Sequence, residues 1–164
     1  MHTDLIRRRV ESQGYADLSN AQLRALDPWL RVTPAITLVW TALATAQGSI
    51  PGLAALVPFV VAGIVLPVHP FDMLVAPLRR RMNGPAIPVS EPPRRFAALL
   101  AAVMLEGATW ALAAGHPGLG TALGGTLVVA AGLNVATGFC LASWLFERVF
   151  GPVARPANAT RQCP

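Results

Sequence analysis

The sequence lacks lysine altogether and has few charged residues of any kind. All 13 basic residues are arginines, only 13% of the 164 residues are charged, and 54% are hydrophobic. Soluble domains carry about twice that share of charge, so the composition excludes an ordinary soluble domain. The net charge of +5 would suit a nucleic-acid partner, but the arginines flank apolar runs. We therefore expect anionic membrane lipid, and no nucleic acid, as their counter-charge.

Motifs for catalysis, metal binding and disulfides are also missing. The two cysteines, Cys140 and Cys163, lie in an apolar run and near the C-terminus, which is not a disulfide framework. The sequence has no glycine-rich phosphate loop, nucleophile elbow, metal-ligand cluster or pair of carboxylates. We therefore expect no enzymatic activity, no cofactor and no metal site.

Four apolar runs, at about 32–47, 52–68, 96–115 and 119–146, dominate the sequence. If each run crosses a bilayer, all the arginines fall on one face, and the other face holds only the uncharged connections. The positive-inside rule places the arginine face, with both termini, in the cytoplasm. The predicted fold is an all-α polytopic membrane protein. A four-transmembrane-helix bundle at 32–150 follows an amphipathic cytoplasmic segment at 1–31 and precedes a disordered tail at 151–164.

The first two runs are short for membrane spans. A bilayer requires about 20 consecutive apolar residues, and each of these runs falls a few residues short. One alternative is a re-entrant hairpin, which would keep both flanks on the same face. Uncharged neighbours such as Thr33 and Gln47 can instead lengthen the first span, and we expect true crossings. Pro58 predicts a kink in the second.

Short amphipathic helices are expected on the cytoplasmic side. Ser19 and Gln22 have the spacing of a capping box and predict a helix that ends before Pro28. From Phe71 to Met82, apolar residues recur at helical spacing and predict one helix in the membrane interface. The residues expected to contact lipid headgroups are Arg79, Arg80, Arg81, Arg94 and Arg95.

A seam of small residues follows the fourth apolar run. Small side chains allow helices in lipid to approach closely, and the first run has a matching stripe of threonines four residues apart. The seam consists of Gly120, Gly124, Ala131 and Gly138, and the stripe of Thr33, Thr37, Thr41 and Thr45. We expect these residues to pack the bundle internally. The alternative is a docking face for a partner protein.

Glu106 is an acidic residue near the middle of the third run. A charge at that depth costs at least about 2.5–3.5 kcal/mol, so the carboxyl group must be protonated or paired. One interpretation is a neutral acid that forms a hydrogen bond with Asn134 on the fourth run. The functional alternative is a proton or ligand site.

Cys140 lies on the cytoplasmic side of Asn134 in the fourth run. It is either a small core residue or a thiol that carries sulfur or exchanges with a redox protein. A dithiol pair would require a second cysteine three residues later, and Ser143 stands there. Separately, Asp72 lies close enough to His69 in sequence to form a local cap or polar pair.

Four short segments together resemble a known family. They are 27–34 (DPWLRVTP), 69–72 (HPFD), 92–97 (PPRRFA) and 138–140 (GFC). The chain resembles the small bacterial membrane proteins of domain of unknown function 4395 over about residues 25–150. The resemblance implies a multi-pass protein of the bacterial inner membrane and a connection to thiol or sulfur chemistry. Some relatives carry the second cysteine that this chain lacks.

Three functional hypotheses follow from these features. The first is a non-catalytic accessory subunit or assembly factor of a larger inner-membrane complex, bound to other membrane proteins or to itself. The second is a membrane protein that handles sulfur or thiol redox equivalents through Cys140. The third is a small transporter or proton-coupled carrier that uses Glu106.

Overall fold

The computed structural model describes residues 19–85 and 92–151, in which helices are the only regular elements. The predicted tail from residue 152 and the amphipathic pattern before Ser19 lie outside these ranges. The helices are α2 (Asn20–Leu30), α3 (Val32–Ala46), α4 (Ile50–Val65), α5 (Pro70–Leu74), α6 (Ala76–Arg81), α7 (Pro92–Ala113), α8 (Pro117–Thr137) and α9 (Leu141–Phe150). The predicted all-α class is therefore confirmed for the described residues.

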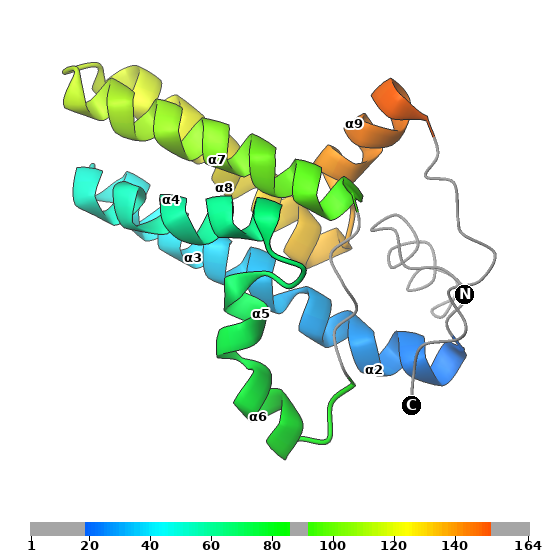
Figure 1. Ribbon diagram of the computed structural model, residues 1–164. Coiled ribbons are helices and arrows are strands. Elements are labelled where there is room, and N and C mark those ends of the chain that lie inside the picture. The colour runs from blue at the N-terminus through cyan, green and yellow to red at the C-terminus, as the bar shows by residue number, and fades with distance from the viewer. Residues whose placement is uncertain (1–18, 86–91, 152–164) are drawn as a thin grey trace.

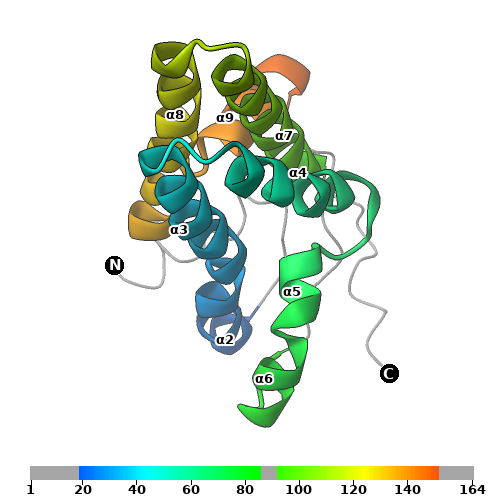
Figure 2. The same cartoon turned by 90° about the vertical axis from the view of Figure 1, so that its left-hand side faces the viewer.

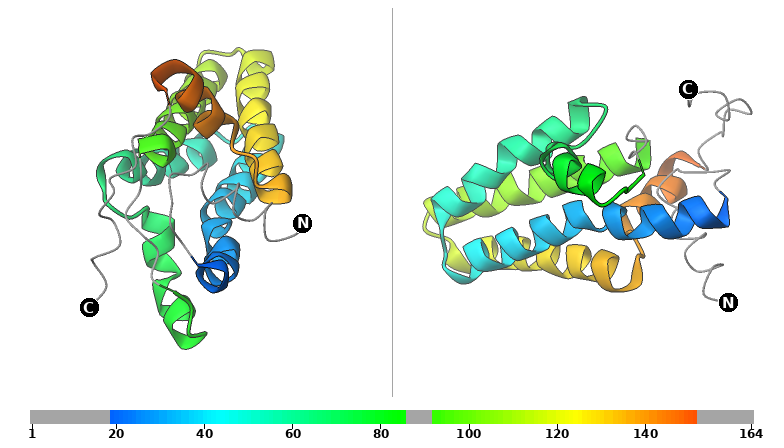
Figure 3. Two further views of the ribbon diagram at one scale, coloured as in Figure 1. Left: turned by 90° about the vertical axis from the view of Figure 1, so that its right-hand side faces the viewer. Right: turned by 90° about the horizontal axis from the view of Figure 1, so that it is seen from below.

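Two helical hairpins, α3–α4 and α7–α8, form the main body of the molecule. They lie side by side with both tight connections at the same end, while α2, α5, α6 and α9 gather at the opposite end (Figures 1 and 3). α3 packs against α4 and α8, and α7 packs against the same two helices. Leu53, Leu56 and Leu105 are completely buried at the centre of this packing.

Two of these helices are long and apolar enough to cross a membrane. α7 has 22 residues and α8 has 21, whereas α3 has 15 and α4 has 16. Length and composition therefore support two membrane-crossing helices where the sequence predicted four spans. α4 continues through Pro58 as one helix.

The sequence predicted the fourth apolar run, 119–146, as one transmembrane helix, and this was wrong because the run is divided between α8 and α9. α8 ends at Thr137, and Gly138 takes the left-handed conformation (φ +71°) while its N–H bonds to the carbonyl of Asn134. Glycine is the residue that adopts this C-terminal turn without a steric penalty. α9 then turns back onto α7, where Phe96 contacts Phe146 and Phe150 at ring-centroid distances of 5.5 and 6.0 Å.

The two helices that the sequence predicted on the cytoplasmic side also differ from their predicted forms. Ser19 and Gln22 do form the capping box, but α2 continues through Pro28 to Leu30, because Leu23, Leu26 and Leu30 are all buried along one face. The segment from Phe71 to Met82 is two short helices separated at Val75. Figure 2 shows α5 and α6 extending away from the main body.

The small-residue seam lies inside the molecule. Gly120, Gly124, Ala131 and Gly138 are buried. A methyl group on Gly120 would lie 2.6 Å from Leu112 Cγ on α7, and one on Gly124 would clash with the Thr45 hydroxyl on α3. The glycines therefore set how closely α8 approaches both neighbours.

Candidate functional site

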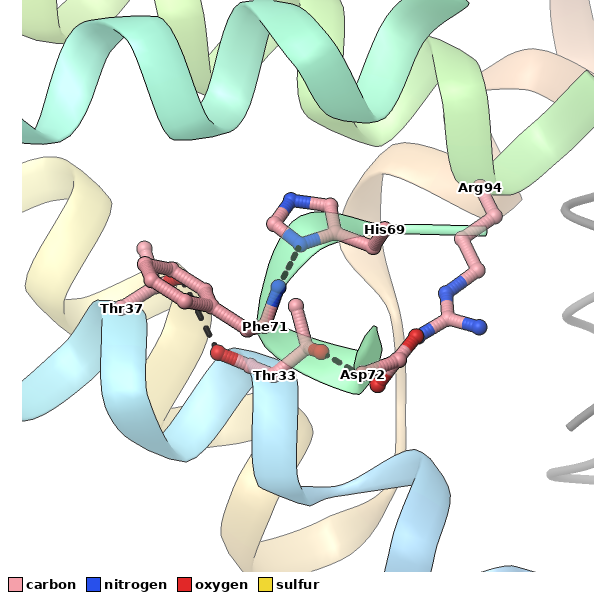
Figure 4. A network of polar contacts seen from close by, with 6 residues as sticks. All are labelled: Thr33, Thr37, His69, Phe71, Asp72 and Arg94. Carbon is pink, nitrogen blue, oxygen red and sulfur yellow. Dashed lines mark hydrogen bonds and ion pairs between the residues drawn. The ribbon is translucent and has the colours of Figure 1, made fainter. Parts of the chain in front are cut away.

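A buried polar cluster joins α3, α5 and α7 at the end of the body that carries the short helices. Asp72 is fully buried, and one of its carboxylate oxygens accepts a hydrogen bond of 2.6 Å from the Thr33 hydroxyl. The other oxygen accepts one of 2.6 Å from the Arg94 guanidinium group, which forms an ion pair with it. Figure 4 shows the three side chains meeting from their separate helices. A buried carboxylate is stable when it is paired in this way.

His69 extends this cluster on the side of α4. It precedes α5, and its Nδ1 accepts a hydrogen bond of 3.3 Å from the Phe71 N–H (Figure 4). Burial lowers the pKa of His69 from 6.5 to about 4; nearby Asp72 opposes this shift, and Arg94 adds to it. The imidazole is therefore neutral at pH 7. Since Nδ1 accepts, Nε2 carries the proton.

The Gly63 position explains how the ring fits against α4. A methyl group there would overlap the Cδ2 atom of His69 and come within 2.6 Å of its Nε2 atom. Gly63 is itself buried in the last turns of α4. The close approach of the imidazole therefore requires glycine at this position.

A cavity of about 350 Å³ lies beside the cluster. His69, Arg94 and Thr33 line it from the cluster, and α7 and α8 contribute mostly alanine and other apolar side chains, including Ala101 and Ala131. Cys140 and Ser143 line it from the start of α9. The volume lies in the range typical of small-molecule sites, which are mostly apolar with a few polar groups.

The segments that meet here are the four that carried the family resemblance. Thr33 belongs to the first, His69 and Asp72 to the second, Arg94 to the third and Cys140 to the fourth. The family model for the domain of unknown function DUF4395 matches residues 27–150. The chain belongs to the DUF4395 family. No curated protein and no solved structure is detectably similar to this DUF4395 chain.

Arg94 does not act as the lipid headgroup contact predicted from the sequence. Its side chain is 13% exposed and forms an ion pair with Asp72 in the interior. An unpaired buried carboxylate is costly, whereas a lipid phosphate at the surface is already solvated by water. Arg80 and Arg81 on α6 are exposed, whereas Arg79 and Arg95 are half-buried. Of the predicted headgroup contacts, Arg80 and Arg81 are therefore the two most available to lipid.

Glu106 and Asn134 are not brought together as a hydrogen-bonded pair among the described residues. Glu106 is exposed on the outer side of α7, while Asn134 is half-buried and lines the cavity. The helical register accounts for this, because Leu105 next to Glu106 is completely buried and takes the inward position. The predicted partnership was wrong, and Glu106 lies outside the cavity.

The sequence missed most of the buried cluster. The spacing of His69 and Asp72 indicated a local polar pair, yet Asp72 bonds to Thr33 and Arg94. Thr33 was assigned to a packing stripe, and Arg94 to the membrane surface. One available signal was Asp72 itself, an acidic residue two positions after Pro70 and followed by the apolar residues Met73, Leu74 and Val75, which requires a counter-charge once it is buried.

Proposed function

We propose that the protein is a non-catalytic accessory subunit of a larger complex in the bacterial inner membrane. In this proposal α3, α4, α7 and α8 each cross the bilayer, and the arginine-rich end with both termini lies in the cytoplasm. The common orientation of the two hairpins supports this topology (Figure 1), as does the absence of Asp, Glu, Lys and Arg from the connections 47–49 and 114–116.

The main observation that supports the proposal is the set of side chains exposed on the outer face of α7. Glu106 is exposed there between Val103, which is 62% exposed, and Trp110, which is 71% exposed. A carboxyl group facing lipid costs at least about 2.5–3.5 kcal/mol when it is charged, and it makes no hydrogen bond within the described part of the chain. A polar group on a helix of another membrane subunit would satisfy it. The proposed partner therefore docks along this face.

Site-specific photocrosslinking in native membranes tests the proposal. A photoreactive residue at Val103 should give a covalent product with another chain, and Glu106→Leu should reduce its yield several-fold. The matched control is Val129, which is also 62% exposed but lies on α8. Mass spectrometry of the Val103 product identifies the partner. Equal products from both positions, or none from Val103 and a free monomer by native mass spectrometry, would contradict the proposal.

Topology is tested separately by labelling single cysteines with a membrane-impermeant maleimide in a background without native cysteines. The cysteines of Ser49→Cys and Gly115→Cys should react in intact cells, from the periplasmic side. The cysteine of Arg80→Cys should react only after the cells are opened. If Ser49→Cys reacts only in opened cells, the re-entrant hairpin would be favoured for α3–α4.

A second candidate function is thiol or sulfur handling at Cys140. The favouring observation is that Cys140 lines a cavity whose lining also includes Ser143, a buried hydroxyl without a hydrogen-bond partner among residues 19–85 and 92–151. Intact-mass analysis of protein from native membranes should then show a sulfur adduct that disappears in Cys140→Ser. An unmodified Cys140 under those conditions would count against this function. The transporter hypothesis gains no support, because Glu106 does not line the cavity.

A further inference from the structure

The cavity between α7, α8 and α9 has a polar group that nothing in the described fold uses. Ser143 is 1% exposed, lines the cavity, and its hydroxyl has no hydrogen-bond partner. Buried hydroxyls are normally bonded, and leaving one unpaired is costly. An oxygen or nitrogen atom of a bound molecule would satisfy it.

The start of α9 adds further donors at the same place. Cys140 precedes the helix and makes no side-chain capping bond, and Leu141, Ala142 and Ser143 of its first turn all line the cavity. The first N–H groups of a helix lack partners within the helix and favour an electron-rich atom. The combination of these N–H groups with the Ser143 hydroxyl therefore suits an oxygen acceptor.

The charges around the cavity favour a ligand whose polar group is neutral over one whose polar group is anionic. Arg94 is the cationic side chain in the lining, and its guanidinium group is already paired with Asp72. His69 is neutral at pH 7. A carboxylate or phosphate would therefore enter without a counter-ion, and an unpaired buried anion is strongly disfavoured.

Most of the remaining lining is apolar, apart from Thr37, Thr126 and Asn134. Leu127 and Ala131 lie at the wall formed by α8, and the exposed Val103 and Leu145 lie in the lining from α7 and α9. At about 30 Å³ for each water-sized group, 350 Å³ accommodates about a dozen such groups. This is the space of a short acyl or isoprenoid tail.

We propose that this cavity binds a neutral lipid-derived amphiphile, whose tail lies between α7 and α8 and whose head oxygen accepts hydrogen bonds from Ser143 and the N-terminus of α9. Entry of the amphiphile from the lipid phase rests on the proposed position of the protein in the membrane. The binding geometry does not depend on that position, so binding can be tested in detergent. A negative result would overturn this inference without affecting the accessory-subunit proposal.

The test uses Cys140 as a reporter of occupancy. Full-length protein with Cys163→Ser is reacted with N-ethylmaleimide in detergent at pH 8, alone or with 1-decanol, decane or decanoate at equal micellar mole fraction. Decanol should slow the labelling of Cys140 several-fold more than decane or ionised decanoate. Ser143→Ala should weaken protection by decanol about fivefold, the loss expected for one hydrogen bond, and leave protection by decane unchanged.

Filling the cavity supplies the matched control. Ala131→Leu adds side-chain volume to the lining and should abolish protection by decanol, whereas the same change at the exposed Ala136 of α8, outside the lining, should not. Circular dichroism and gel filtration confirm that each variant is folded, and Ser143→Gly, which also removes the hydroxyl, replaces Ser143→Ala if that variant is not. Equal protection by decanol and decane, stronger protection by decanoate, or a co-purified phospholipid displaced by Ala131→Leu would overturn the proposal.

Discussion

Arg94 on α7 and Asp72 on α5 form an ion pair with an N–O distance of 2.6 Å, although 22 residues separate them in sequence. Thr33 on α3 donates to the same carboxylate. This contact fixes the start of α7 against the short helix that follows α4. It also positions the polar end of the cavity, because Thr33, His69 and Arg94 all line it.

Removal of Arg94 should be strongly destabilising. Arg94→Met leaves Asp72 as an unpaired buried charge, and the expected loss in unfolding free energy is about 3–5 kcal/mol. Adding Asp72→Asn should recover much of that loss, because asparagine is neutral and can still accept the Thr33 hydrogen bond. Denaturant unfolding in detergent measures both, with Arg80→Met as the exposed control. A similar loss in Arg80→Met would refute the assigned role.

The two adjacent glycines of α8 should respond oppositely to alanine. A methyl group at Gly124 would clash with the Thr45 hydroxyl, so Gly124→Ala should cost about 1–3 kcal/mol. Gly125 has open space around it, and alanine there should stabilise α8 by up to about 1 kcal/mol through helix propensity. Thermal unfolding of the two variants compares them, and Thr45→Ala should partly rescue Gly124→Ala. Identical midpoints would show that α3 and α8 do not approach this closely.

Stability should fall in acid because of His69. Its pKa in the folded protein is about 4, below the ordinary 6.5, so the unfolded chain binds more protons between these values. The contribution is fully present above pH 6.5 and is lost as pH falls toward 4, by about 3 kcal/mol in total. His69→Asn keeps a capping acceptor without titrating near this pH.

The measurement for His69 is the unfolding free energy of both proteins at intervals from pH 7 to pH 4. Carboxyl groups titrate in both, so the difference between the two curves isolates the histidine. Parallel curves would mean that the imidazole is not buried in its neutral form.

Glu106 should matter little to the isolated protein. It is exposed and forms no hydrogen bond in the described ranges, so Glu106→Leu should change the unfolding free energy by no more than about 0.5 kcal/mol. The same variant should give several-fold less of the Val103 crosslinked product in membranes. A large loss of stability in detergent would instead indicate an intramolecular role for the carboxyl group.

Local features of the fold were readable from the sequence because they depend on neighbouring residues. The capping box of Ser19 and Gln22 is formed as predicted, since both partners lie within one turn. Apolar content and the uncharged connections predicted where α3, α4, α7 and α8 lie along the chain. The break at Gly138 was missed because the apolar run continues across it, and hydropathy does not register a left-handed turn.

The sequence by itself determined that the chain is helical, rich in apolar residues and asymmetric in its arginines, since composition and periodicity carry that information. Only the tertiary structure decided which polar residues meet. Thr33, Asp72 and Arg94 come from three helices, and their pairing depends on how those helices pack. Glu106 faces outward for the same reason: packing against α4 and α8 selected the neighbouring Leu105 for the core.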